Sequence, residues 1–179
     1  VALVAGGAPT PVEVASDLPR SQGSFAVCQT VYVELWASVS TPGGDGLAAV
    51  YVDMSFDPSR LTIEQVTPSP LFGLFVQGAA DRKAGRVAST GGCALLGESQ
   101  LGVSPSWVRV VTLEVSGQRR GPAVVTTHPS GEGYGIALLN QLGLLDASQI
   151  AFGGAAFQLR GESHRLMSPA LNASHPHPR

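Results

Sequence analysis

The stretch that decides the fold is GLAAVYVDMSFDPSRLTIEQVTP, which runs from Gly46 to Pro68. Every second position of its first half is apolar: Val50, Val52, Met54 and Phe56. The positions between them are Ala49, Tyr51, Asp53 and Ser55. A period of two residues predicts a strand that has one face in the core and the other face turned away from it. The Asp57–Pro58 pair predicts a turn, after which Leu61 and Ile63 resume the alternation.

Further segments of the chain share this strand-like pattern. The clearest are VYVELWASV (31–39), WVRVVTLEV (107–115), PAVVTTH (122–128) and IAFGGAAFQL (150–159). Segments rich in glycine, proline and aspartate separate them, and no window carries a sustained helical period. We therefore expect an all-β chain of about seven to nine strands, folded as an antiparallel two-sheet β-sandwich rather than a barrel.

Composition excludes several other classes. The 179 residues include 22 Gly and 13 Pro, which argues against helical bundles, coiled coils and Rossmann-type folds. The formal net charge is −2, and no run of basic residues predicts nucleic-acid binding. The longest apolar stretches reach roughly eight residues, far short of the ~20 that a membrane-spanning helix needs. We expect a soluble chain with no membrane span.

The length fits one domain with flanking segments. Residues 1–24 form an N-terminal segment with an expected edge strand around Val12–Val14. Residues 25–161 form the sandwich. Residues 162–179 are rich in proline, serine and histidine and predict a flexible tail.

The segment 46–68 resembles the pattern of cohesin domains: a glycine-led alternating strand, an aromatic-Asp-Pro turn, a short Leu-x-Ile strand and a proline. The segments 107–115 and 122–128 resemble the late hairpin of cohesins, and 150–159 resembles their closing strand. The resemblance covers about 130 residues, from Thr30 to Gly161. It implies a jelly roll of the cohesin and carbohydrate-binding superfamily. The amino-acid sequence is similar to that of cohesin-like modules in large exported proteins of planctomycete-type bacteria.

The resemblance also implies a function. Cohesins bind dockerin helices through one face of the sandwich, which includes the strand after Gly46. It therefore implies a non-catalytic, extracellular or cell-surface module for protein–protein association, with Ala49, Tyr51, Asp53 and Ser55 on the binding face. The polar contact positions of cohesins fall on Ala49 and Tyr51, where this chain lacks the usual Asn and Asp.

Three aromatic residues leave an alternative open. Tyr32, Trp36 and Tyr51 point away from the core if the strand predictions hold. Outward rings on neighbouring strands form a platform for a sugar or a protein, which would make the chain a carbohydrate-binding module of the same superfamily. The other interpretation is that a loop or the N-terminal segment covers them. The expected partner is accordingly a protein or a polysaccharide.

The sequence predicts no enzyme and no cofactor. Asp53 and Asp57 lie roughly 13 Å apart along an extended strand, beyond the ~5 to 9.5 Å of glycosidase carboxylates. A serine nucleophile elbow is missing, and His128 is expected in a loop. A structural calcium ion at the loop residues Asp45 and Asp81 remains open, although no Asp-x-Asn-x-Asp run supports it.

Cys28 and Cys93 are the two cysteines of the chain. We expect a disulfide between them, which would add about 4 kcal/mol of stability and imply an oxidising compartment. Two free thiols are the alternative.

Overall fold

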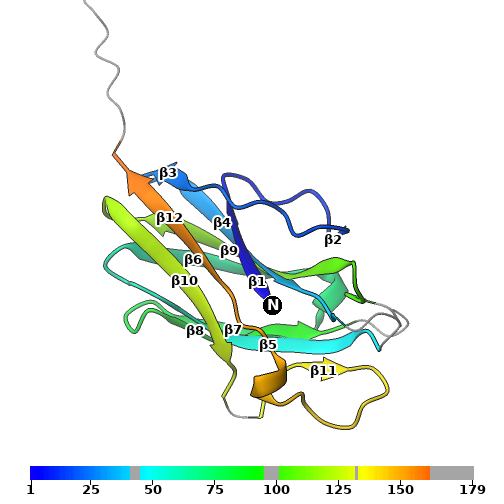
Figure 1. Cartoon of the computed structure of the whole chain (residues 1–179). Helices are drawn as coiled ribbons and strands as arrows, with labels where there is room; N and C mark the ends of the chain where they lie inside the picture. Colours follow the sequence, from blue (N-terminus) through cyan, green and yellow to red (C-terminus); the bar gives the residue numbers. More distant parts are fainter. Residues whose placement is uncertain (41–44, 95–100, 132, 162–179) are drawn as a thin grey trace, which may run out of the picture.

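The computed structural model describes residues 1–40, 45–94, 101–131 and 133–161. Figure 1 shows two β-sheets packed face to face, connected by turns and two short 3-10 helices, η1 (Pro70–Phe72) and η2 (Ala147–Gln149). The predicted all-β, two-sheet jelly-roll sandwich is confirmed. The described residues contain twelve strands instead of seven to nine, because several short strands carry no periodicity of their own. The tail predicted at 162–179 lies outside the described residues.

The smaller sheet has five strands. It contains β1 (Ala2–Gly6), β4 (Thr30–Ala37), β9 (Trp107–Gly117) and β2 (Val14–Ala15) in that order, with β6 (Leu61–Pro68) also paired to β9. All of its strand pairs are antiparallel.

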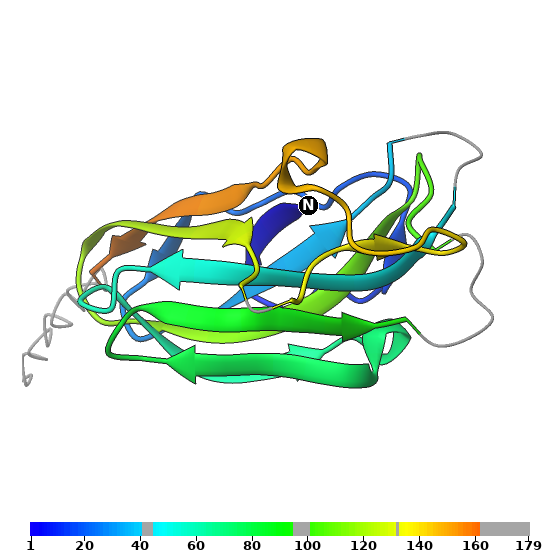
Figure 2. The same ribbon diagram turned by 90° about the horizontal axis from the view of Figure 1, so that it is seen from below.

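The larger sheet has seven strands. Their order is β3 (Ser24–Ala26), β12 (Gly154–Arg160), β10 (Gly121–Pro129), β5 (Leu47–Phe56), β8 (Arg86–Cys93) and β7 (Leu74–Asp81), with β11 (Ala137–Leu138) also paired to β5. The β3–β12 pair is parallel, and the other pairs are antiparallel. Figure 2 shows this sheet from its outer side.

The core lies between the two sheets. The inward residues predicted for β5, Val50, Val52, Met54 and Phe56, are all buried in it. In β9 a bulge opposite Leu35 and Trp36 leaves Val110 without a register partner. The bulge adds one residue to the strand, which explains why the alternation of apolar residues breaks at Val110 and Val111.

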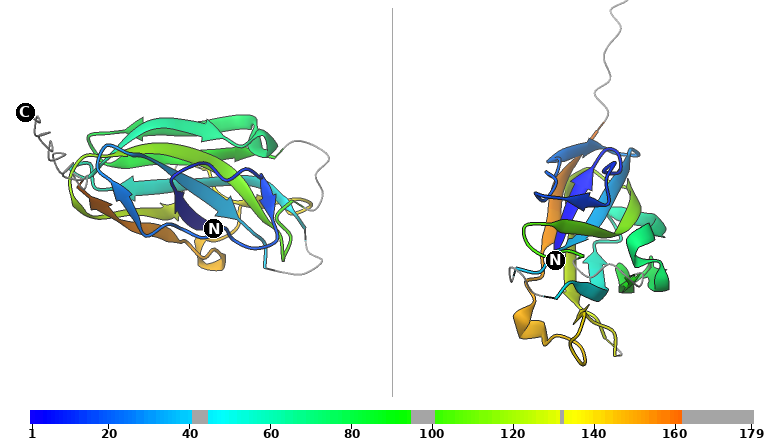
Figure 3. Two further views of the ribbon diagram at one scale, coloured as in Figure 1. Left: turned by 90° about the horizontal axis from the view of Figure 1, so that it is seen from above. Right: turned by 90° about the vertical axis from the view of Figure 1, so that its right-hand side faces the viewer.

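The N-terminal segment belongs to the sandwich. Its first strand, β1, forms one edge of the five-stranded sheet beside β4, and the expected edge strand is β2 beside the start of β9. Between them, residues 7–13, here called the N-terminal strap, cross the outer face of this sheet (Figure 3). The predicted boundary at residue 25 therefore does not separate two structural units.

Candidate functional site

The outer face of the seven-stranded sheet carries the predicted binding residues of β5. The half of this face that carries Ala49 and Tyr51 is covered by another part of the same chain. The segment after β10 continues along the same edge of β5, where Tyr51 N donates to Gly135 O over 3.1 Å and Ala137 pairs with Ala49. Ala49 and Tyr51 are consequently buried.

Tyr51 is a structural residue, contrary to its prediction as an exposed anchor. Its side chain is enclosed, with 5% of the residue exposed, and its ring centroid lies 5.0 Å from that of Tyr134. Its hydroxyl donates to Phe75 O over 2.8 Å and lies 3.4 Å from Cys93 Sγ. Burial, together with the hydrogen bond and the charge of Cys93, raises the pKa of this phenol, so it stays neutral.

The other half of the face remains open and polar. Ser55 Oγ lies 2.8 Å from both Thr126 Oγ1 and His128 Nε2, and Thr126 Oγ1 lies 3.0 Å from the same imidazole nitrogen. Cross-strand pairing of β5 with β10 brings these side chains together, which places His128 in a strand and not in the predicted loop. Sequence reasoning missed this cluster because Ser55 lies 71 residues from Thr126 and 73 from His128. We call Ser55, Thr126 and His128 the hydroxyl–imidazole cluster.

Asp53 flanks this cluster, but its carboxylate forms hydrogen bonds with other groups. Its carboxylate accepts from the Arg86 guanidinium and, over 2.8 Å, from Ser89 N. The carboxylate therefore does not orient the His128 imidazole in the way a serine–histidine–aspartate triad requires. Among the described residues no group of three or more His, Cys, Asp or Glu side chains could hold a metal ion. Asp45 accepts from Asn140 Nδ2, and Asp81 accepts from the backbone of its own turn.

Two of the three predicted aromatic residues lie on the opposite side of the molecule from Tyr51. Tyr32 and Trp36 belong to β4 in the five-stranded sheet, whereas Tyr51 belongs to β5 in the seven-stranded sheet. Outward residues of the two strands therefore face away from each other and cannot form one platform. Tyr32 is half-buried beside β1, and Trp36 is completely buried. Other parts of the chain cover Trp36 and Tyr51, which agrees with the second interpretation for these two rings, and the exposed platform is wrong.

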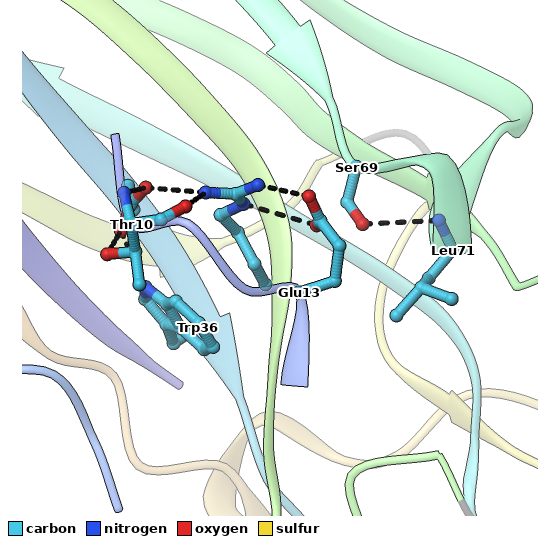
Figure 4. A network of polar contacts seen from close by, with 7 residues as sticks. Thr10, Glu13, Trp36, Ser69 and Leu71 are labelled. Carbon is cyan, nitrogen blue, oxygen red and sulfur yellow. Dashed lines mark hydrogen bonds and ion pairs between the residues drawn. The ribbon is translucent and has the colours of Figure 1, made fainter. Parts of the chain in front are cut away.

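A buried polar network holds the strap over Trp36 (Figure 4). Glu34 Oε2 accepts from Trp36 Nε1 over 3.1 Å and from Thr10 Oγ1 over 2.5 Å. Glu34 Oε1 accepts from Thr10 N over 2.7 Å and from Arg109 Nη1 over 2.8 Å. Arg109 also binds the carboxylate of Glu13 in the strap. Among the described residues no buried side-chain nitrogen or oxygen lacks a hydrogen-bond partner, so this network needs no external ligand.

The predicted disulfide is wrong, and both cysteines are free. Cys28 lies before β4, where its backbone N donates to Gly117 O at the end of β9. Cys93 is the last residue of β8 and pairs with Ala49 and Leu74, toward the opposite end of the sandwich. The thiols therefore lie in different parts of the fold, and they give no support for an oxidising compartment.

A cavity of about 430 Å³ opens at the end of the sandwich where β4 ends and β5 begins. Its lining combines apolar residues, such as Leu47, Trp107 and Ile136, with polar ones, such as Ser38 and Gln149. The described part of the chain contains no helix that is long and apolar enough to cross a membrane.

Comparisons with known proteins bear on the fold. No protein-family model matches the sequence, and no curated protein matches it. Among solved structures, the chain resembles CaCohA2 from Clostridium acetobutylicum, with a TM-score of 0.54 and 20% identity over 79% of this chain and 88% of that one. It also resembles the cohesin module of a family 33 glycoside hydrolase from Clostridium perfringens, with a TM-score of 0.53 and 12% identity over 79% of this chain and 93% of that one.

A third similar structure is the Coh-OlpC–Doc435 complex, a type I cohesin–dockerin complex from Clostridium thermocellum. Its TM-score is 0.50, with 12% identity over 77% of this chain and 90% of that one. At these identities the similarity establishes architecture, and it spans most of each compared chain. The chain therefore has the jelly-roll fold of cohesin modules.

Proposed function

We propose that the chain is a non-catalytic module that binds a protein partner and assembles it with other components. The fold supports this proposal, since one similar structure is a cohesin bound to a dockerin. The observation that carries it is the open half of the seven-stranded sheet, where the hydroxyl–imidazole cluster presents hydrogen-bonding groups that solvent can reach.

The proposed contact surface differs from the one that the resemblance implies. Cohesin contact positions fall on Ala49 and Tyr51, and the chain seals both with its own segment after β10. The polar groups of this chain lie further along β5, at Ser55, and across on β10, at Thr126 and His128. Exposed Val124 on β10 adds an apolar contact beside them. We infer that the partner docks toward β10, with Ser55 and His128 as its main hydrogen-bonding contacts.

Binding of purified dockerin modules tests this proposal. The wild-type chain is titrated against a panel of dockerins by calorimetry, together with His128→Ala and Ser55→Ala. Loss of one hydrogen bond weakens binding by about two- to ten-fold. The matched control is Gln65→Ala, an exposed residue of β6 in the other sheet, which should bind like wild type. Absence of binding to the whole panel, or equal binding by all variants, contradicts the proposal.

The platform predicted for carbohydrate binding, formed by Tyr32, Trp36 and Tyr51, is not present. The three predicted rings lie on opposite faces, and Trp36 and Tyr51 are buried. A neutral sugar that stacks on aromatic rings would therefore find no platform among them.

Extracellular or cell-surface placement is part of the proposal, and it comes from the family resemblance alone. The unbridged cysteines add nothing to it. Labelling of intact source cells with a membrane-impermeant reagent tests it. A chain that is labelled only after lysis contradicts the placement.

A further inference from the structure

Seven of the 11 basic residues of the chain gather at one end of the sandwich. They come from the β5–β6, β7–β8 and β9–β10 connections and from the adjoining strand ends, and this end is on the left in Figure 2. We call this set the basic end: Arg60, Arg82, Lys83, Arg86, Arg119, Arg120 and Arg160. All are exposed except Arg60, which is half-buried. The sequence contains no run of basic residues that would predict this cluster, because its members come from connections that are far apart in the sequence.

Backbone contacts confirm that these connections adjoin one another. Phe56 N donates to Gly85 O over 2.8 Å, which joins the β5–β6 and β7–β8 turns. The Arg60 guanidinium donates to Arg120 O, which joins the first of these to the β9–β10 turn. The Arg120 guanidinium in turn lies against Gly161, directly after Arg160.

The cations lie at several strand ends. Arg160 ends β12, Arg120 precedes β10 and Arg86 begins β8, all in the seven-stranded sheet, and Arg60 directly precedes β6 of the other sheet. Neighbouring strands lie about 4.8 Å apart, so the backbones of Arg160 and Arg120 are adjacent, and Arg86 lies on the far side of β5. Cations spread over several strand ends suit an extended ligand that carries several negative charges.

Nearby carboxylates do not cancel this charge. Asp53 pairs with Arg86, and Asp57 lies 3.9 Å from Arg60 Nε and accepts from Ser59 N. Asp81 accepts from two backbone N–H groups of its turn, and Glu64 accepts from Ser116 Oγ. Seven basic residues against these four acidic ones leave an excess of three positive charges, in a chain with a formal net charge of −2.

We propose that the basic end binds a linear, carboxylate-bearing polysaccharide. Six of the seven cations are arginines, whose planar guanidinium groups match carboxylates through paired hydrogen bonds. The exposed large aromatic residues of the described chain, Phe75 and Tyr134, lie elsewhere, so this end lacks the stacking surface of single-stranded nucleic-acid binders. The basic end meets the sheet face proposed for the protein partner at Arg86, which pairs with Ser55 in register, whereas Arg119 and Arg160 lie at other positions of this end.

Binding to polygalacturonate tests this inference, with dextran as the uncharged polymer. The full chain should bind polygalacturonate and not dextran, and binding should fall steeply between about 0.1 M and about 1 M salt as the Debye length shrinks. Arg119→Gln and Arg160→Gln remove exposed charges, and each should weaken binding by about two- to five-fold. Arg20→Gln removes the same charge from an exposed arginine that does not belong to the basic end, and it is the matched control.

Four outcomes overturn the proposal. They are equal binding to dextran, equal weakening by Arg20→Gln, unchanged binding by both test variants, and tighter binding to polyglutamate or single-stranded DNA than to polygalacturonate. Thermal unfolding of each variant verifies that the fold is intact. Because dockerin binding is tested with other variants, His128→Ala and Ser55→Ala, failure here leaves the proposed function unaffected.

Discussion

Glu34 and Arg109 form an ion pair on the outer face of the five-stranded sheet, with 2.8 Å between Oε1 and Nη1 and only 3% of the Glu34 side chain exposed. Burial by itself would lower the pKa of Arg109, but hydrogen bonds and charges of Glu13 and Glu34 outweigh it and raise that pKa. Arg109 therefore keeps its charge, and its contacts with Glu34 and with Thr10 O fix the N-terminal strap to the sheet.

Removal of one partner should destabilise the chain strongly. Arg109→Met leaves the buried Glu34 carboxylate without its cation, and we expect a loss of about 3 to 5 kcal/mol in the free energy of unfolding. Chemical denaturation measures it. Arg119→Met, which changes an exposed arginine at the basic end, is the matched control and should stay within about 0.5 kcal/mol of wild type. A small effect of Arg109→Met would show that the strap is not held by this network.

The alternation along β5 was sufficient to predict which of its residues enter the core. Val50, Val52, Met54 and Phe56 are buried because the period of a strand is fixed by its backbone. A sequence pattern is local, however, and it does not assign a strand to a sheet. Tyr32 and Tyr51 lie on consecutive long strands, yet these strands belong to different sheets.

Glycines account for another difference between sequence and structure. The Gly91–Gly92 pair has the composition of a turn, but β8 continues through it to Cys93. Gly91 has a φ of +145°, and a Cβ there would lie 1.8 Å from Val50 O. Glycine is required at this position because the two backbones approach closely, and this requirement cannot be distinguished from a turn signal in one sequence.

The candidate site was harder to predict than the fold. Whether Tyr51 and Trp36 are exposed depends on what covers them. Thr10 of the strap covers Trp36 and its partner Glu34, and Tyr134 covers Tyr51. Neither covering segment has a strand-like period, so the sequence gives no sign of where it packs.

Phe56 should contribute substantially to stability. It is buried at the end of β5, and Phe56→Ala should lower the free energy of unfolding by about 3 to 5 kcal/mol. Phe75→Ala is a matched control, because Phe75 is 78% exposed and the same substitution there should cost less than about 0.5 kcal/mol. Urea denaturation of both variants decides the matter, and similar losses would contradict the inward assignment of Phe56.

Asp146 should make the free energy of unfolding depend on pH in the acidic range. Hydrogen bonds from the Ser148 hydroxyl and backbone N–H lower its pKa below the ordinary 3.8. A depressed folded-state pKa gives stability that is present above the unfolded-state value and lost as pH falls through the folded-state value. Asp146→Asn should therefore flatten the decline between about pH 5 and about pH 2. Asp17→Asn removes an equal charge and should leave the decline as in wild type; an unchanged profile for Asp146→Asn contradicts the expectation.

Cys28 and Cys93 should react as two separate thiols. Titration of the unfolded, unreduced chain with a thiol reagent should find both, because no bond joins them. In the folded chain Cys28 is exposed, whereas Cys93 is half-buried beside the Tyr51 hydroxyl, so Cys28 should react first. Cys28→Ser should abolish the fast phase and leave the slow one, which identifies each thiol. No reactive thiol in the unfolded chain would restore the disulfide, and a faster Cys93 would contradict the packing of Tyr51 against it.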